Sequence, residues 1–259
     1  MTRSLAVLLL WLLSACASQP HDETKNWTPD KIYSEAKAEL TAGNYKKAIL
    51  LYEKLQSRYP YGRYAQQAEL EIAYAHFKDS EPVQALAAAD RFIKLHPDHP
   101  NVDYAFYLKG LINFHEDLGL IGGFFQSDLN DRDPKGARES FDAFKEVVTR
   151  FPQSRYAADA SARMTYLVNT LAGGEVRIAE YYLRRQAYVA AVNRAQFVVT
   201  NYPQTPAVER ALLVMVAAYD AMGVQDLRAD AQRLLSLNYP NSKLKVADLK
   251  KSRKWWDLW

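Results

Sequence analysis

Hydrophobic positions along most of the chain recur with the 3.6-residue period of an amphipathic helix. In segment 45–59, residues one and two turns apart share a face: Tyr45, Ala48, Ile49, Tyr52 and Leu55. No segment of the sequence shows the sustained polar–apolar alternation, bounded by hairpin turns, that predicts strands. The pattern therefore predicts an all-α fold.

Turn and cap residues predict where these helices begin and end. Gly43-Asn44 is typical of a helix stop followed by a turn. Three dipeptides pair an N-cap residue with a proline at the first helical position, and each predicts a helix start: Thr28-Pro29, Asp133-Pro134 and Thr205-Pro206.

A dipeptide of an aromatic residue or histidine followed by proline recurs along the chain at spacings of 37, 55, 51 and 37 residues: Tyr59-Pro60, His96-Pro97, Phe151-Pro152, Tyr202-Pro203 and Tyr239-Pro240. Each proline predicts the end of a helix, because proline cannot donate to the backbone ladder. Small residues stand twelve positions before the first four prolines, at Ala48, Ala85, Ser140 and Ala191, and Arg228 takes this place in the fifth unit. Eight positions after the first four prolines stand Ala68, Ala105, Ala160 and Ala211. Small residues at fixed offsets indicate places where two helices approach closely.

The unit Gly43-x-Tyr45-x-x-Ala48-x-x-x-Tyr52-(x7)-Pro60 resembles the tetratricopeptide repeat, a helix hairpin of 34 residues. This resemblance implies a right-handed solenoid of about five such hairpins over residues 29–242, with an extended concave surface. The two long spacings exceed 37 by 18 and 14 residues, and we assign the excess to a loop at 117–133 and to a lengthened helix pair around Gly173-Gly174. The fifth unit, with Arg228 in place of a small residue, is predicted to be a terminal capping repeat.

The first residues are predicted to be a targeting signal. Arg3 precedes an apolar run of nine residues, 5–13, which is too short to span a bilayer and typical of a signal peptide over 1–15. Leu13-Ser14-Ala15-Cys16 resembles the bacterial lipobox, which implies a diacylglycerol and an N-acyl chain on Cys16; the alternative is an ordinary secretory signal with a chance cysteine. Ala17 after the cysteine resembles an outer-membrane sorting signal. Residues 16–28 are expected to be a lipidated tether, with Trp27 docked on the first helix.

Composition narrows the function classes. The chain carries 33 Lys and Arg against 30 Asp and Glu, a formal charge of +3 that does not favour nucleic-acid binding. A single Cys excludes an internal disulfide and a zinc site built on cysteines.

No group of residues predicts catalysis, a metal or a bound cofactor. His96 and His99 lie in a polar turn and lack the spacing of a helical metal pair. Gly119, Gly122 and Gly123 are not followed by the Lys-Ser/Thr of a phosphate-binding loop. We therefore expect a binding protein rather than an enzyme.

Three segments carry features beyond a plain solenoid. Loop 117–133 places Phe124 and Phe125 among further apolar residues, segment 180–194 sets aromatics beside arginines, and tail 243–259 mixes Lys and Arg with three Trp. Each segment is a candidate partner surface. The alternatives are that the loop folds onto the solenoid, that the arginine segment is a solvated face and that the tail is a frayed terminus.

The ordered motifs resemble the BamD family, the lipoprotein subunits of the outer-membrane β-barrel assembly machinery. They are Arg58-Tyr59-Pro60-Tyr61-Gly62-x-Tyr64, Asp90-Arg91-Phe92-Ile93-x-Leu95, Asp131-Arg132-Asp133-Pro134, Ala179-Glu180-Tyr181-Tyr182 and Ala190-x-Val192-Asn193-Arg194. The resemblance implies a non-enzymatic scaffold on the periplasmic face of the outer membrane. Its expected partners are BamA-type POTRA domains, BamC- and BamE-type lipoproteins and the C-terminal segments of unfolded outer-membrane proteins.

The resemblance also implies site residues. Repeats in 29–100 are expected to read substrate through Ser57, Tyr59, Tyr61, Gly62 and Tyr64. Repeats in 101–242 are expected to dock partners through Arg184, Arg185, Tyr188 and Arg194, of which Arg194 matches a family arginine that couples to the barrel subunit. Ser57 departs from the amide that is commoner in the family. The alternative function is a periplasmic tetratricopeptide adaptor for cell-wall synthesis.

Overall fold

A computed structural model describes residues 22–118 and 135–250. Cys16, the loop residues Phe124 and Phe125, and the tail from 251 onward lie outside the described residues, so the predictions made on them stay predictions. The chain divides into two compact units, one ending at Asp79 and one beginning at Ser80. Each unit is described by itself.

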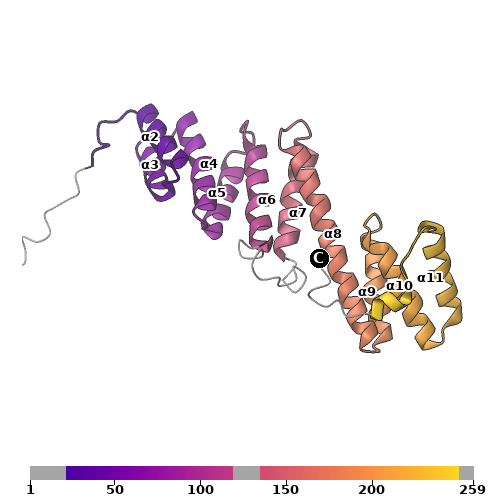
Figure 1. The fold of residues 1–259 in the computed structure, drawn as a ribbon. Helices are drawn as coiled ribbons and strands as arrows, with labels where there is room; N and C mark the ends of the chain where they lie inside the picture. Colours follow the sequence, from indigo (N-terminus) through magenta and orange to yellow (C-terminus); the bar gives the residue numbers. More distant parts are fainter. Residues whose placement is uncertain (1–21, 119–134, 251–259) are drawn as a thin grey trace, which may run out of the picture. The chain divides into compact units, whose positions relative to one another are not determined.

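The described residues form helices joined by turns, which confirms the all-α prediction (Figure 1). The first unit holds α2 (Pro29–Thr41), α3 (Tyr45–Arg58) and α4 (Arg63–Lys78). The second unit holds α5 (Pro82–Leu95), α6 (Val102–Leu118), α7 (Lys135–Arg150), α8 (Ala157–Arg184), α9 (Tyr188–Asn201), α10 (Ala207–Met222), α11 (Gln225–Asn238) and the short α12 (Val246–Lys250). Neighbouring helices within each unit pack on one another, as expected of stacked hairpins.

The proline marks end helices as predicted. Four of the residues before the prolines are helix C-caps, namely Tyr59, His96, Tyr202 and Tyr239. The extra 14 residues of the fourth unit lengthen α8, which runs for 28 residues through Gly173 and Gly174. This accounts for the second length assignment, whereas the loop assigned to 117–133 lies almost entirely outside the described residues.

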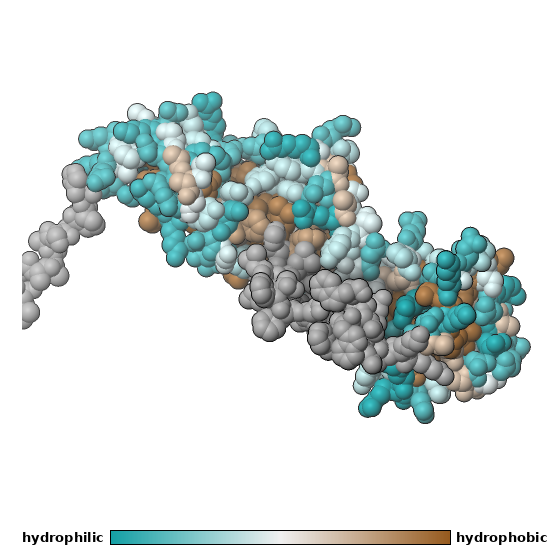
Figure 2. All heavy atoms as spheres, in the orientation of Figure 1, coloured by the Kyte–Doolittle hydropathy of each residue, from teal (hydrophilic) through white to brown (hydrophobic). Residues whose placement is uncertain are grey.

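The small residues lie where helices touch. Ala48, Ala68, Ala85, Ala105, Ser140, Ala160, Ala191 and Ala211 are all 0% exposed. Larger apolar side chains fill the space around them, and the hydrophobic residues gather between helices while the outward faces are mostly hydrophilic (Figure 2). Burying each large side chain contributes about 1.5–3 kcal/mol to folding.

A close helix approach joins α6 to α7 at Gly110. A Cβ on Gly110 would lie 2.5 Å from Cε1 of Phe144, a ring that is fully buried. Ser140 Oγ donates a hydrogen bond of 2.9 Å to the Gly110 carbonyl across the same contact. Glycine on one helix and a small hydroxyl on the other therefore set the spacing of this pair.

One predicted N-cap residue caps its helix, and another does not. Thr28 caps α2, and its Oγ1 accepts from Lys31 N at 3.3 Å. Asp133-Pro134 lies outside the described residues. Thr205 was expected to cap the third predicted start, but this was wrong by one residue: Pro206 occupies the cap, and Thr205 Oγ1 donates to the Tyr202 carbonyl at 2.9 Å. The hydroxyl satisfies the turn that follows α9 rather than the helix that begins after it.

A residue in the left-handed conformation lies in four of the turns between helices. Gly43 and Gly223 have φ of 82° and 72°, and Ser80 and Gln186 occupy the same conformation with φ of 61° and 62°. The two glycines adopt it without strain, since they lack a Cβ. Among residues 22–118 and 135–250, no helix combines the length and apolar character needed to cross a membrane.

Candidate functional site

Three tyrosines meet in the first unit, one from each of its helices. Tyr33 of α2 lies 5.7 Å from the Tyr52 ring of α3 and 5.3 Å from the Tyr64 ring of α4. We call Tyr33, Tyr52 and Tyr64 the tyrosine cluster. Tyr52 is fully buried, and its hydroxyl finds no hydrogen-bond partner in the part of the chain that the structure describes. Burial, aided by the nearby Glu71 carboxylate, raises the pKa of both Tyr33 and Tyr52, so both stay neutral at physiological pH.

A carboxylate network borders the tyrosine cluster. Glu71 of α4 accepts from Lys37 Nζ at 2.8 Å, from Tyr33 Oη at 3.3 Å and from Gln67 Nε2 at 3.3 Å. Glu71 is only 9% exposed, and such a charge needs these donors. The network holds α2 and α4 in register, so their shared face is preorganised.

The predicted substrate-reading residues cluster at the turn from α3 to α4. Tyr59 Oη donates to the Trp27 carbonyl at 3.1 Å, and Tyr64 Oη donates to Asp30 Oδ1 at 2.6 Å. Tyr61 lies between them in the chain and is 91% exposed. The turn therefore anchors two tyrosines and presents the third to solvent.

Two smaller residues complete that turn. Ser57 is exposed on the last turn of α3. Gly62 is the N-cap of α4 with φ of +97°, a conformation that side chains rarely adopt. The backbone thus turns sharply between the exposed Tyr61 and the start of α4.

The segment before α2 is fastened to this turn. Lys31 Nζ lies 4.6 Å above the Trp27 ring, which confirms that Trp27 docks on the first helix. Asp22 accepts from Thr24 Oγ1 at 2.7 Å and from Lys54 Nζ at 2.9 Å, and it also pairs with Arg58. The Thr24 and Lys54 hydrogen bonds hold the pKa of Asp22 well below its usual range. We call the contacts of Asp22 with Thr24, Lys54 and Arg58 the Asp22 clasp. The sequence pattern predicted a tether at Asp22 and did not predict these contacts.

The predicted docking residues of the second unit lie at the junction of α8 and α9. Arg194 Nη1 pairs with Glu175 Oε2 at 2.9 Å, and its side chain stays 46% exposed. The Arg185 guanidinium lies 5.9 Å from the Tyr181 ring centre. Such exposed pairs contribute about 0–1 kcal/mol each, so these arginines keep donors available for a partner.

A hollow of about 620 Å³ gathers some of these residues. Arg184 and Tyr188 line it together with Asp220 and Arg228, which form an ion pair of 2.9 Å between α10 and α11. Arg185 and Arg194 are not part of its lining. The structure thus brings together two of the four predicted docking residues and leaves the other two on the adjoining surface.

Behind this surface, a buried carboxylate links two helices. Glu180 of α8 is 7% exposed and pairs with Arg210 of α10. Arg184 Nη1 lies 4.0 Å from the same carboxylate. Glu180 appeared in a sequence motif, but its pairing role depends on a partner 30 residues away.

The candidate metal residues of the sequence have packing roles. The His96 and His99 rings lie 5.3 and 5.1 Å from the Phe92 ring. His99 Nδ1 accepts from Asn101 N at 3.1 Å, so this nitrogen stabilises the turn that precedes α6.

Comparison with known proteins places the chain in a family. A family model described as outer membrane lipoprotein, YfiO, matches residues 25–234. A protein of Neisseria meningitidis serogroup B named outer membrane protein assembly factor BamD is 47% identical, covering 98% of both chains. The protein of that name from Vibrio cholerae is 38% identical over 90% of this chain and 96% of its own. The crystal structure of MamA protein covers 84% of this chain and 98% of its own at 16% identity, with a TM-score of 0.39. The family model matches most of the chain, and the relatives match nearly all of it. The chain therefore belongs to the YfiO family of outer membrane lipoproteins.

Proposed function

We propose that the chain is an assembly factor for outer-membrane proteins and acts as a lipid-anchored scaffold. The observation that carries this proposal is the near full-length match to relatives that bear this name. The helix hairpins supply the architecture of a polypeptide-binding protein. The scaffold role assigns no catalytic residue and needs no nucleotide.

The first unit is proposed to read the C-terminal segments of unfolded outer-membrane proteins. Such segments carry aromatic side chains and unpaired backbone groups. Tyr61 is presented to solvent on a turn that Tyr59 and Tyr64 hold in place. A fixed tyrosine contributes contact area at low entropic cost, because only two side-chain torsions are restricted.

The second unit is proposed to dock the POTRA domains of a BamA-type barrel protein, and BamC- and BamE-type lipoproteins. The proposed contacts are Arg184, Arg185, Tyr188 and Arg194. Arginine and tyrosine are enriched among the residues that dominate binding energy at interfaces.

Acyl chains on Cys16 are proposed to hold the scaffold at the periplasmic face of the outer membrane. Two or more chains anchor stably, whereas one binds marginally. Confinement raises the effective concentration of the scaffold near its membrane partners.

Peptide binding tests the substrate assignment. A fluorescent peptide copying the last ten residues of an outer-membrane porin is titrated with the full chain. Tyr61→Ser should weaken binding about fivefold, since it removes roughly 1 kcal/mol of aromatic contact. Leu50→Ser is the matched control, because Leu50 is also an exposed apolar residue of the first unit, 59% exposed on α3. Equal affinity of the Tyr61 variant and the unchanged chain would remove this turn from the substrate site.

Docking to purified POTRA domains tests the second assignment. Arg194→Leu should weaken the complex, whereas Glu175→Gln should not, because it removes only the intramolecular partner of Arg194. If both variants weaken docking alike, Arg194 acts by holding α8 to α9 rather than by touching the partner.

Membrane fractionation tests the anchor. Cys16→Ser should give a folded chain that leaves the outer-membrane fraction. Retention of this variant there, with no partner protein present, would contradict the lipid anchor.

A further inference from the structure

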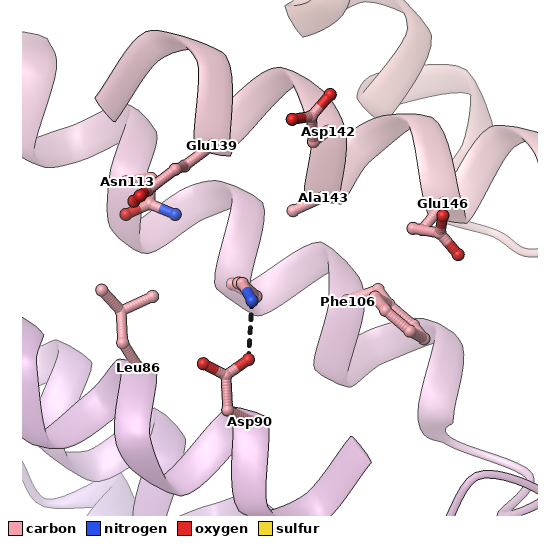
Figure 3. Close-up of a pocket in the computed structure, with 9 residues that line it drawn as sticks. Leu86, Asp90, Phe106, Asn113, Glu139, Asp142, Ala143 and Glu146 are labelled. Atoms are coloured by element: carbon pink, nitrogen blue, oxygen red, sulfur yellow. Dashed lines mark hydrogen bonds and ion pairs between the residues drawn. The ribbon is translucent and has the colours of Figure 1, made fainter. Parts of the chain in front are cut away.

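The second unit carries an acidic groove that neither proposed surface uses. It lies over α5, α6 and α7 and has a volume of about 370 Å³ (Figure 3). On α6 and α7 its polar residues are spaced three or four apart, so each of these helices contributes one stripe, and α5 contributes a single carboxylate. The polar residues are Asp90, Lys109, Asn113, Glu139, Asp142 and Glu146. We call this set the acidic groove.

The groove carries more negative than positive charge. Lys109 Nζ pairs with Asp90 Oδ1 at 2.6 Å across α5 and α6. Glu146 pairs with Arg150 at 3.2 Å, and Glu139 lies 3.8 Å from Lys135. Asp142 has no ion-pair or hydrogen-bond partner in residues 22–118 and 135–250. The α7 stripe therefore has one carboxylate without a partner among the described residues, Asp142. Beside it lies Glu139, whose ion pair with Lys135 is long.

A buried donor at the same place also lacks a partner. Asn113 is 2% exposed and lines the groove, and its Nδ2 has no acceptor in the described part of the chain. A buried amide without its hydrogen bond destabilises the folded chain. Figure 3 shows Asn113 and Glu139 on facing helices at one end of the groove. An acceptor from outside the chain would satisfy this amide.

The two observations select one kind of ligand. The carboxylates need a cation and the amide needs an acceptor, and a peptide with a basic side chain supplies both. A metal ion fits less well, since within the described ranges no three carboxylate or imidazole side chains come together as a metal site. Arginine fits better than lysine, because its planar fork can donate to two carboxylates at once.

We propose that the acidic groove binds an extended segment of a partner polypeptide through one arginine. The guanidinium donates to the Asp142 and Glu139 carboxylates, and a backbone carbonyl of the same segment accepts from Asn113 Nδ2. This site is separate from the α3–α4 turn and from the α8–α9 surface. It stands whether or not the chain assembles outer-membrane proteins.

Three labelled peptides test the ligand chemistry. Each has eleven residues of alternating Gly and Ser around a central arginine, lysine or citrulline, and each is titrated with the full chain by fluorescence polarisation at 50 mM and 300 mM salt. The arginine peptide should bind more tightly than the lysine peptide, and the neutral citrulline peptide should bind most weakly. The preference for arginine should shrink at high salt. Equal binding of the arginine and citrulline peptides would overturn the proposal.

Two substitutions test the location. Asp142→Asn should weaken binding of the arginine peptide about fivefold, as for one partly exposed ion pair. Glu53→Gln, which removes an exposed carboxylate of α3, is the charge-matched control and should leave binding unchanged. Equal losses from both variants would show that only net charge matters, and would overturn the site.

Asn113→Leu separates a binding role from a structural one. Leucine has nearly the same volume and no donor, so the variant should melt at a higher temperature while it binds the arginine peptide less tightly. A lower melting temperature would mean that the amide already has a partner in the folded chain, and would overturn its assignment to the ligand.

Discussion

Substituting alanine for Gly110 tests the packing that brings α6 against α7. Alanine in the middle of a helix is favoured over glycine by about 1 kcal/mol, so propensity alone predicts that Gly110→Ala stabilises the chain. Packing predicts the reverse. The new Cβ would lie 2.5, 2.6 and 2.9 Å from three atoms of the Phe144 ring.

The Phe144 ring cannot move aside at low cost. It is fully buried, and the Tyr107 and Phe114 rings lie 5.8 and 6.2 Å from it. A normal carbon–carbon contact of about 3.5 Å requires a shift of about 1 Å, either of this ring or of the two helices. Overpacking of this kind costs about 1–3 kcal/mol. After the propensity gain is subtracted, the net effect of Gly110→Ala should be a destabilisation of up to about 2 kcal/mol.

Gly173→Ala is the matched control for Gly110→Ala. Gly173 also lies within a helix, α8, but the nearest atom to its added Cβ is Arg177 Nη1 at 3.9 Å. With no clash, helix propensity decides, and Gly173→Ala should stabilise the chain by up to about 1 kcal/mol.

Urea denaturation followed by circular dichroism measures both variants. The unfolding midpoint should fall for Gly110→Ala and rise for Gly173→Ala. In a Phe144→Leu background, the Gly110→Ala penalty should largely disappear, because the smaller side chain leaves room for the methyl group. The reasoning is refuted if Gly110→Ala raises the midpoint as much as Gly173→Ala does.

Three further substitutions test single interactions. Tyr52→Phe should be neutral or stabilise the chain by about 1 kcal/mol in urea denaturation, since it removes a buried hydroxyl that has no partner among the described residues; a loss of 2 kcal/mol or more would contradict this. Arg210→Ala should destabilise by about 2 kcal/mol because it deprives the buried Glu180 of its main partner, and Glu180→Gln in the same chain should recover part of the loss. Asp22→Asn should speed amide hydrogen exchange in residues 22–27 at pH 7. The pKa of Asp22 is lowered on folding, so its contribution is present above its unfolded pKa of about 3.9 and is lost as the pH falls through its folded value. The difference between the variant and the unchanged chain should therefore shrink in strong acid.

Repeat-level features of the fold were predictable from the sequence. Proline after an aromatic residue marks a helix end by a local backbone rule, and alanine at a fixed offset marks a helix contact because only a small side chain fits there. Both rules depend on residues close in the chain. They predicted the ends at Tyr59 and Tyr202 and the buried positions Ala105 and Ala160.

Features that join distant residues were not predictable. The Asp22 clasp depends on Arg58, 36 positions away, and nothing local to Asp22 marks it. Ser80 and Gln186 adopt the left-handed turn without being glycine, so the turn-forming rule missed them. The acidic groove collects single residues from three helices, and only the packing of those helices shows that Asn113 is buried beside them.

Depletion of the chain from living cells tests the central claim most directly. After depletion, newly made porins are followed by pulse-labelling, and folding is scored by the resistance of the barrel to unfolding in detergent without heat. The account predicts that unfolded porin accumulates while cell-wall synthesis continues, and that the unchanged chain restores folding. Normal porin folding with a primary defect in cell-wall synthesis would contradict the account and favour a cell-wall adaptor.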